Sequence, residues 1–212
     1  MPLKTDKKIG LFGLSANPPH DGHIAMAQYA KDMLSLEEIW WVVAAQNPLK
    51  APHELAPFQD RYEMACDMAA DHDWLKVTDI ENREGVNKSF DMLTIIKQQN
   101  PKDSFVWIIG GDNLTSFHKW YKWQEIINMI PIAVMARPGE MEKAVKSKAM
   151  VYTKTHATQQ SEAQKNGFIL LDNPLFPISS TKIRNAFKNY PKTVQGTHPN
   201  VIQRIREKGL YL

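Results

Sequence analysis

The chain has 212 residues, of which 43% are hydrophobic and 23% charged, with a net charge of +3 and a single cysteine. This length suits one domain, no apolar run approaches the roughly 18 residues of a membrane helix, and no internal disulfide can form, so we predict a cytoplasmic protein. The modest positive charge favours small anionic substrates and speaks against binding to nucleic acid or to a membrane surface.

Apolar runs typical of buried strands alternate with helical patterns along the chain. This alternation predicts an α/β protein with a Rossmann-like, doubly wound, mostly parallel sheet and helices on both faces. We expect one domain over residues 1–212, with a flexible lead-in at 1–7, a variable loop at about 152–167 and a helical part at 177–212. The strand-like runs are Ile9 to Phe12, Ile39 to Ala45, Leu75 to Ile80, Phe105 to Ile109, Ile132 to Ala136 and Phe168 to Leu171.

A polar loop follows the first predicted strand. Gly13 gives the backbone freedom for a sharp turn, and Ser15 and Asn17 place small polar groups beside main-chain N–H groups. A helix then begins at about His20, so its positive end and the loop amides predict a phosphate site. His20 and His23 are three residues apart, and both imidazoles can therefore reach one phosphate from the same side of the helix.

Two histidines at this spacing could instead form half of a metal site. A zinc site would need further ligands, and Cys66 and the other histidines are scattered without a second cluster. The sequence therefore favours phosphate binding and predicts no metal site made by the protein.

The middle of the chain holds weaker signals. Lys50 stands in a proline-rich loop after the second strand and could reach a phosphate. Arg61 projects away from the apolar stripe of a helix and is interpreted as structural, with bracing of the loop that carries Lys50 as an alternative role. Ser89 either caps a helix or marks backbone amides that bind an anion, and Lys88 could add a charge there.

Gly110 and Gly111 follow a central strand and allow a ligand to approach the backbone. Asp112 can then accept hydrogen bonds from ribose hydroxyls, hold Mg²⁺ through water, or cap the next helix. Trp120 belongs to an aromatic stretch that either packs in a core or stacks on a base, and Trp123 is expected in the core.

Three hydroxyl side chains precede the helix near residue 180. Ser180 and Thr181 can cap this helix or bind phosphate, and Arg184, one turn further on, can form paired hydrogen bonds with a phosphate. Capping alone would be the simpler interpretation of this stretch.

Two of these stretches together resemble a known family. Residues 15–23, Ser-Ala-Asn-Pro-Pro-His-Asp-Gly-His, and residues 178–184, Ile-Ser-Ser-Thr-Lys-Ile-Arg, resemble the signatures of the His-x-Gly-His nucleotidyltransferases, and within them the bacterial nicotinate mononucleotide adenylyltransferases. The resemblance extends from Lys8 to Leu212. The chain departs from the usual pattern at Leu14, where the family has glycine, at Ala16, where it has an aromatic residue, and at Asn87 to Ser89, where it has Ser-Tyr-Thr.

The resemblance implies transfer of AMP from ATP to nicotinate mononucleotide in NAD biosynthesis, giving deamido-NAD and pyrophosphate, with Mg²⁺ bound to the ATP. The partners would be ATP and a pyridine mononucleotide, and the sequence is compatible with a homo-oligomer. The implied catalytic residues are His20, His23, Lys50 and Arg184; those for ATP and its phosphates are Gly13, Ser15, Asn17, Gly110, Asp112, Ser180 and Thr181; those for the mononucleotide are Lys88, Ser89 and Trp120.

Three alternatives remain at this point. The acceptor could be nicotinamide mononucleotide, which differs only in how residues 87–89 and Trp120 meet the ring. It could be another phosphate such as phosphopantetheine, although the Ser-Ser-Thr-Lys-Ile-Arg stretch speaks against this. The protein could also be a non-catalytic nucleotide-binding module, which the presence of His20 and His23 disfavours.

Overall fold

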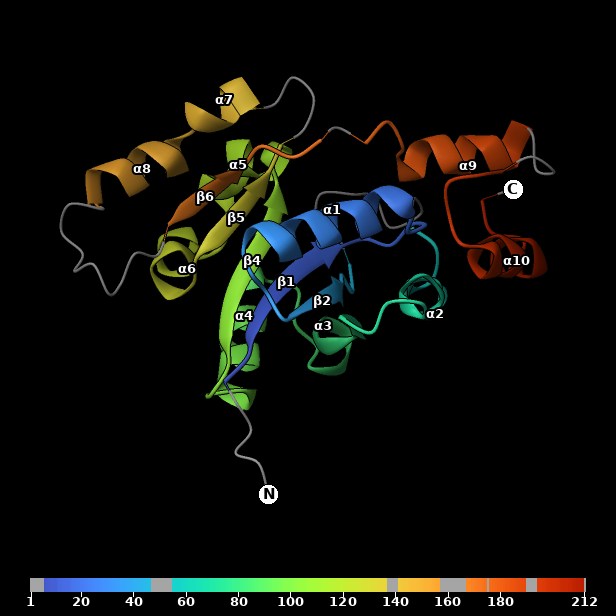
Figure 1. The fold of residues 1–212 in the computed structure, drawn as a ribbon, viewed down its shortest axis with the longest axis horizontal. Coiled ribbons are helices and arrows are strands. Elements are labelled where there is room, and N and C mark those ends of the chain that lie inside the picture. The colour runs from blue at the N-terminus through green and yellow to red at the C-terminus, as the bar shows by residue number, and fades with distance from the viewer. Residues whose placement is uncertain are drawn as a thin grey trace. The chain divides into compact units, whose positions relative to one another are not determined.

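The computed structural model describes residues 6–46, 55–136, 141–156, 167–174, 176–189 and 194–211, without the side chains of Met141 and His156. Its six strands form one parallel sheet in the order β3-β2-β1-β4-β5-β6 (Figure 1). The predicted Rossmann-like α/β fold is thereby confirmed. The strands are β1 (Lys8–Leu14), β2 (Glu38–Val43), β3 (Leu75–Thr78), β4 (Ser104–Gly110), β5 (Ile132–Met135) and β6 (Phe168–Leu171).

Helices separate the strands, as the sequence predicts. They are α1 (Asp21–Met33), α2 (Phe58–Ala69), α3 (Ile80–Arg83), α4 (Ser89–Gln99), α5 (Gly111–Ser116), the 3₁₀ helix η2 (Phe117–Lys119), α6 (Trp123–Met129), α7 (Met141–Val145), α8 (Lys148–His156), α9 (Ser180–Asn189) and α10 (Pro199–Lys208). Among the described residues, no helix is both long and apolar enough to cross a membrane.

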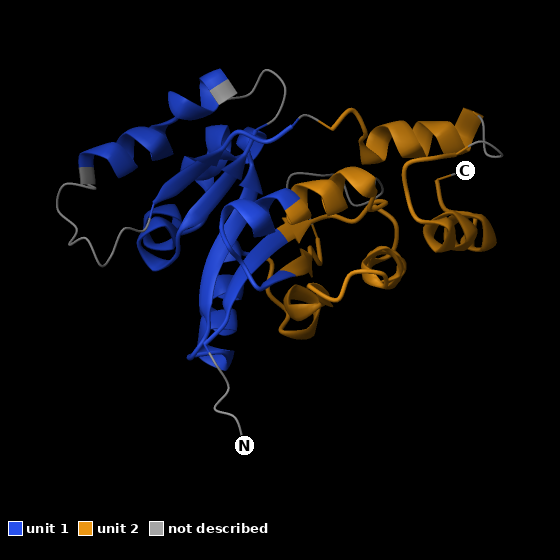
Figure 2. Ribbon diagram, in the orientation of Figure 1, with its two compact units in different colours: residues 1–12, 29–39, 88–175 blue, residues 13–28, 40–87, 176–212 orange. Residues whose placement is uncertain are grey.

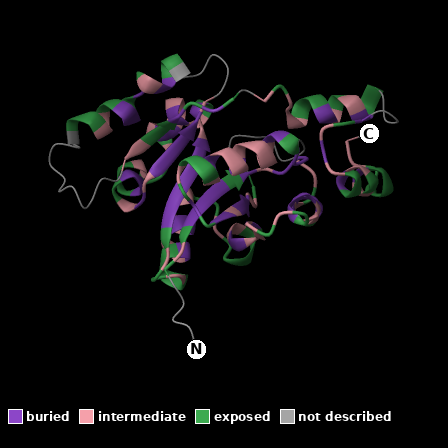
Figure 3. Ribbon diagram, viewed as in Figure 1, coloured by how far each residue is buried: buried purple, intermediate pink, exposed green. Residues whose placement is uncertain are grey.

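The central strands are almost entirely buried. In β1, β4 and β5 apolar side chains follow one another without alternation, because both faces of a parallel sheet are covered. Figure 3 shows this burial along the central strands. Leu11 lies opposite Trp107 in the β1–β4 pair, and Trp107 lies opposite Ile132 in the β4–β5 pair, so the cores of these strands are in register.

The chain divides into two compact units, which Figure 2 colours separately. Unit 1 comprises residues 1–12, 29–39 and 88–175, and unit 2 comprises residues 13–28, 40–87 and 176–212. An aromatic cluster fills part of unit 1, where the Phe117 ring lies 5.1 Å from Trp120 and 5.5 Å from Phe168.

Unit 2 combines α2 with α9 and α10, which follow it by more than a hundred residues in the sequence. α10 packs on α2, and the fully buried side chains of Val201 and Ile205 on α10 face the core of the unit. α9 buries Ile183 and Phe187 in the same way. Because one face of each helix carries charged residues, these elements combine an apolar contact with a solvated surface.

Two segments differ from the sequence-based expectation. The first part of the span expected as a loop at 152–167 is helical, because α8 continues to His156 and Tyr152 packs edge-on against Trp123 with ring centroids 5.0 Å apart. Residues 157–166 lie outside the described part of the chain. In the expected lead-in, Lys7 is already tied down, since its N–H donates to Asp103 Oδ1 over 3.1 Å.

Candidate active site

The loop between β1 and α1 is buried along most of its length. Asn17 is 2% exposed and His20 is 5% exposed, and the peptide bond between Asn17 and Pro18 is cis. The predicted turn at Gly13 is wrong, because β1 continues through this residue and a Cβ there would meet nothing within 4 Å. Ala16 is the residue in the left-handed region, with φ of 50°.

The two histidines of the first motif are in contact in unit 2. The backbone N–H of His20 donates to Nδ1 of His23 over 3.1 Å, and the two ring centroids lie 3.7 Å apart with planes inclined by 32°. Because Nδ1 of His23 accepts a hydrogen bond, the neutral ring carries its proton on Nε2. His23 is therefore oriented as a hydrogen-bond donor through Nε2.

Gly22, between these histidines, is needed for steric reasons. A Cβ at this position would lie 2.7 Å from Cγ2 of Ile178 and 3.0 Å from the His20 ring. Distances this short would displace one of the two side chains. The glycine of the His-x-Gly-His motif therefore allows His20 and the segment before α9 to pack closely.

The second motif meets the first within unit 2. Nη1 of Arg184 donates to the carbonyl of Asn17 over 2.8 Å, and Oγ of Ser180 donates to the carbonyl of Pro18 over 2.8 Å. Nη2 of Arg184 also contacts Oγ1 of Thr181 at 3.3 Å. Residues up to 167 positions apart in the sequence are thereby joined at the loop that leads into His20.

The predicted cap of α9 is off by one residue. Ser180 is the first residue of the helix, and the hydroxyl that caps it belongs to Ser179, whose Oγ accepts from the N–H of Lys182 over 3.3 Å. The Ser180 hydroxyl instead binds the Pro18 carbonyl. Thr181 is exposed, so its hydroxyl is accessible to a ligand.

Arg61 is the main feature of the site that sequence analysis underestimated. Its side chain is 2% exposed and donates to four main-chain carbonyls in three separate segments. The acceptors are Ser15 at 2.8 Å, Ala44 at 2.7 Å, Ala45 at 2.9 Å and Ala56 at 3.0 Å. One guanidinium therefore joins the first loop to the end of β2 and to the start of α2.

Glu81 is half-buried near this arginine. Its Oε2 accepts from the N–H of Ala45 over 3.0 Å. Burial raises the pKa of Glu81 to about 7, against the opposing effects of the Ala45 hydrogen bond and the charge of Arg61. Burial likewise lowers the pKa of Arg61, so loss of hydration disfavours the charge on both side chains.

Glu81 makes the stability depend on pH. Its carboxyl normally titrates near 4.5, so between that value and about 7 the unfolded chain releases a proton that the folded protein keeps. This contribution to the free energy of unfolding is present below pH 4.5 and is lost as the pH rises to 7, by roughly 3 kcal/mol in full. Urea unfolding at pH 5 and pH 8 should show this loss in the wild type and not in Glu81→Gln. Parallel changes in the two proteins would contradict the assignment.

Lys50 lies outside the described residues. The segments on either side of it are ordered by Arg61, which binds the carbonyls of Ala45 and Ala56. The Phe58 ring lies near both Arg61 and Tyr62, with its centroid 5.4 Å from Cζ of Arg61 and 6.2 Å from the Tyr62 ring.

The remaining predicted residues belong to unit 1. Gly110 ends β4 in extended conformation, with φ of −78° and ψ of 153°, and precedes α5. Asp112, in the first turn of α5, is exposed, and Gly110 occupies the N-cap position, so Asp112 is not the N-cap residue of this helix. Its carbonyl accepts from Oγ1 of Thr115 over 2.8 Å.

The cap predicted at Ser89 is also wrong. Lys88 occupies the N-cap position of α4 in extended conformation, and Ser89 is the first helical residue, with no side-chain cap hydrogen bond. Lys88 is exposed and Ser89 half-buried. Trp120 is half-buried and stacks on Phe117 at an interplanar angle of 27°.

The described residues contain no group of three or more His, Cys, Asp or Glu side chains arranged to hold a metal ion. Magnesium in nucleotide-dependent enzymes is commonly held by substrate phosphates, waters and one or two carboxylates, so such a group is not required for its use. Asp112 is an exposed carboxylate of a kind that fits this limited role.

With this geometry established, comparison with known families gives a match over residues 11–186 to the cytidylyltransferase-like model. The chain belongs to the cytidylyltransferase-like family. The matched region of this family ends inside α9, so α10 and the residues after it lie beyond the match.

Curated relatives of this cytidylyltransferase-like protein are more than a third identical to it over the aligned residues. A protein of Agrobacterium fabrum named "probable nicotinate-nucleotide adenylyltransferase" is 37% identical over 186 residues, covering 85% of this chain and 99% of the relative. A protein of Rhizobium leguminosarum bv. trifolii with the same name is 39% identical over 183 residues, covering 84% and 95%.

Solved structures share the fold of the chain. The Plasmodium falciparum nicotinic acid mononucleotide adenylyltransferase complexed with NaAD matches with a TM-score of 0.72 and 18% identity, over 97% of both chains. The same enzyme complexed with APC matches with a TM-score of 0.69 and 17% identity, again over 97% of both chains.

Proposed function

We propose that the protein transfers AMP from ATP to nicotinate mononucleotide, releasing pyrophosphate and forming deamido-NAD. The observation that carries this proposal is the meeting of two motifs on one loop, with His20 and His23 at the start of α1 and Arg184 bound to the Asn17 carbonyl. Two curated relatives that align with this chain over 99% and 95% of their own length are named for this activity.

The reaction needs no nucleophile from the protein. A phosphate oxygen of the mononucleotide attacks the α-phosphorus of ATP in line, the bond between that phosphorus and the bridging oxygen breaks, and pyrophosphate leaves with the bonding electrons. The protein has to position the two phosphates and stabilise the charge that develops between them. His23 is suited to this because Nε2 carries the ring proton.

Further assignments extend this proposal to the rest of the site. Lys50 and Arg184 place positive charge at the triphosphate, and Mg²⁺ bound with ATP would offset the charge of the pyrophosphate, with Asp112 as the carboxylate that would hold it through water. Lys88 and the amides near Ser89 receive the carboxylate of the pyridine ring. The residues assigned to ATP and its phosphates are Gly13, Ser15, Asn17, Gly110, Asp112, Ser180 and Thr181.

Trp120 is assigned to the pyridine ring. Trp120→Ala should raise the KM for the mononucleotide roughly tenfold and change kcat much less, because stacking holds the substrate in the ground state and the transition state alike. Steady-state kinetics at saturating ATP measures this. Trp123→Ala is the matched control, since that ring packs on Tyr152. Equal KM values for Trp120→Ala and the wild type would assign Trp120 to the core alone.

The decisive experiment is pyrophosphate release with ATP and Mg²⁺, comparing nicotinate and nicotinamide mononucleotides at matched concentrations. A strong preference for the acid supports the proposal and shows that Lys88 in place of the usual tyrosine preserves recognition of the carboxylate. A preference for the amide would change the substrate, and no release with either would overturn the proposal in favour of another acceptor or a non-catalytic module.

A further inference from the structure

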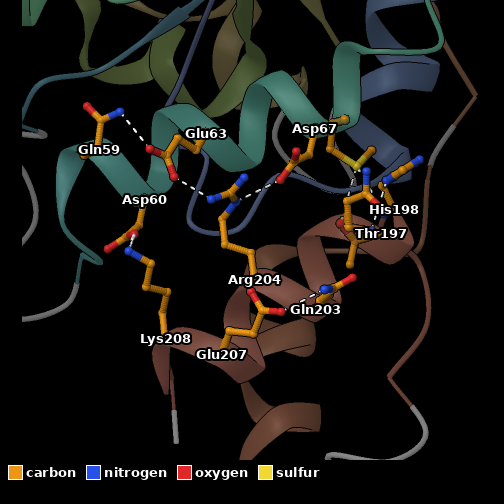
Figure 4. A network of polar contacts seen from close by, with 12 residues as sticks. Gln59, Asp60, Glu63, Asp67, Thr197, His198, Gln203, Arg204, Glu207 and Lys208 are labelled. Atoms are coloured by element: carbon orange, nitrogen blue, oxygen red, sulfur yellow. Dashed lines mark hydrogen bonds and ion pairs between the residues drawn. The ribbon is translucent and has the colours of Figure 1, made fainter.

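The C-terminal helix is fastened to α2 by a network of charges (Figure 4). Arg204 lies between two acidic residues of α2, with Nε donating to Asp67 Oδ2 over 2.8 Å and Nη1 paired with Glu63. One turn later, Nζ of Lys208 lies 3.6 Å from Asp60 Oδ1. Together with the buried apolar side chains of α10, these contacts determine where the chain leaves the helix.

The chain then turns back sharply. Gly209 ends α10 in the left-handed region with φ of 62°, and the N–H of Leu210 donates to the carbonyl of Ile205 over 3.0 Å, which closes the helix end. Tyr211 also lies in the left-handed region, with φ of 64°. A residue other than glycine rarely adopts this backbone conformation unless other contacts hold it there.

The contact that holds Tyr211 is with the first loop. Its hydroxyl donates to Oδ1 of Asn17 over 2.7 Å, across 194 positions of sequence. The same Oδ1 accepts from the N–H of Ala56 over 2.9 Å. Burial raises the pKa of Tyr211, so its hydroxyl keeps the proton that it donates at neutral pH.

The neighbouring carbonyls are bound from the same part of the chain. Besides the contacts of Arg184 and Ser180, Oγ1 of Thr197 donates to the carbonyl of Pro19 over 2.9 Å, and the Gly196 carbonyl accepts from the N–H of Asp21 over 3.0 Å. Three consecutive carbonyls before His20 are therefore bound by donors from residues 180–197, and Tyr211 adds a contact to a side chain of the loop.

We propose that Tyr211 is a positioning residue for the reaction: its hydroxyl holds Asn17 and thereby sets the loop that delivers His20 and His23 to the phosphates. This inference rests on the proposed function, and it assigns a catalytic consequence to a residue beyond the region matched by the family. Tyr211 acts through Asn17 and does not contact the reacting atoms.

The test removes one oxygen atom. Tyr211→Phe should lower kcat about five- to tenfold with little change in the KM for the mononucleotide, because a displaced loop weakens contacts made in the transition state. Tyr62→Phe is the matched control, since Tyr62 belongs to the same unit and its hydroxyl contacts Cys66 and not the loop. The control should retain the wild-type kcat.

Double variants test whether Tyr211 acts through Asn17. When Tyr211→Phe is added to Asn17→Ala, kcat should fall no further. When Tyr211→Phe is added to Tyr62→Phe, kcat should fall by the same factor as in the single variant Tyr211→Phe. Hydrogen exchange across residues 13–20 gives a readout that needs no turnover, and it should be faster in Tyr211→Phe than in the wild type or Tyr62→Phe.

The outcomes separate this inference from the proposed function. If the wild type releases no pyrophosphate with either mononucleotide, the proposed function fails, and hydrogen exchange alone still decides whether Tyr211 orders the loop. If the wild type is active and Tyr211→Phe matches it in kcat, or lowers kcat equally with and without Asn17, the positioning role is overturned.

Discussion

Replacing His23 with alanine is expected to lower kcat by about a hundredfold or more and to change the KM for ATP far less. Nδ1 of His23 accepts from the backbone N–H of His20, so the ring is held with its proton on Nε2. A donor fixed in this way before the reaction stabilises charge that appears only in the transition state, and removing such a donor costs roughly 10²–10³ in kcat. Pyrophosphate release at saturating substrates measures the effect.

Two further variants at the same position sharpen this test. The side-chain nitrogen of His23→Gln can replace Nε2 as a donor, whereas the oxygen of His23→Asn can replace only Nδ1 as an acceptor. If donation from Nε2 matters, glutamine should keep more activity than asparagine. His72→Ala, in the same unit and packed on Trp74, should leave kcat unchanged. A near-normal kcat in His23→Ala would remove the catalytic assignment.

Patterns of apolar residues were sufficient to predict the fold. Each predicted strand overlaps an observed one, with ends that agree to within two residues, because burial on both faces of a parallel sheet produces continuous apolar runs. Helix starts were less well determined. Capping is one of two alternatives at both Ser89 and Ser180, and each proves to be the first helical residue, since several polar residues in a row can all satisfy the capping pattern.

The contacts around the first loop could not have been read from the sequence. The sequence predicts a structural role for Arg61 and allows it to brace the loop that carries Lys50, but it does not predict that the side chain is almost fully buried and binds four carbonyls. Backbone carbonyls are present at every residue, so no side-chain pattern marks those of Ser15 or Ala45 as acceptors. The contact of Tyr211 with Asn17 is equally hidden, because it depends on how α10 packs and ends.

These contacts explain how the loop can differ from the usual family pattern at Leu14 and Ala16. Both side chains are buried, and Ala16 takes a left-handed conformation that favours glycine. The strain at Ala16 is offset by hydrogen bonds on either side of it, from Arg61 to the Ser15 carbonyl and from Arg184 to the Asn17 carbonyl. The loop is thus held by its surroundings rather than by its own sequence.

Arg61→Met should cause the largest loss of stability among the substitutions considered. Methionine fills much of the same space but donates no hydrogen bond, so four half-buried carbonyls lose a donor and Glu81 loses the nearby positive charge. Breaking a buried charged network from one side costs about 3–5 kcal/mol. That is a large share of the roughly 5–15 kcal/mol of a typical domain, and urea unfolding near pH 7 measures it.

Two further variants separate the effect of the Arg61 hydrogen bonds from the effect of its charge and from the effect of replacing an arginine by methionine on any helix. Arg61→Lys keeps a positive charge but has three donors on one atom, which cannot reach carbonyls in three segments, so its stability should lie between those of the wild type and Arg61→Met. Arg206→Met, on the exposed face of α10, should stay within about 0.5 kcal/mol of the wild type. If Arg61→Met cost no more than Arg206→Met, the loops would be held by packing alone, and the assignment of Arg61 as their common anchor would have to be withdrawn.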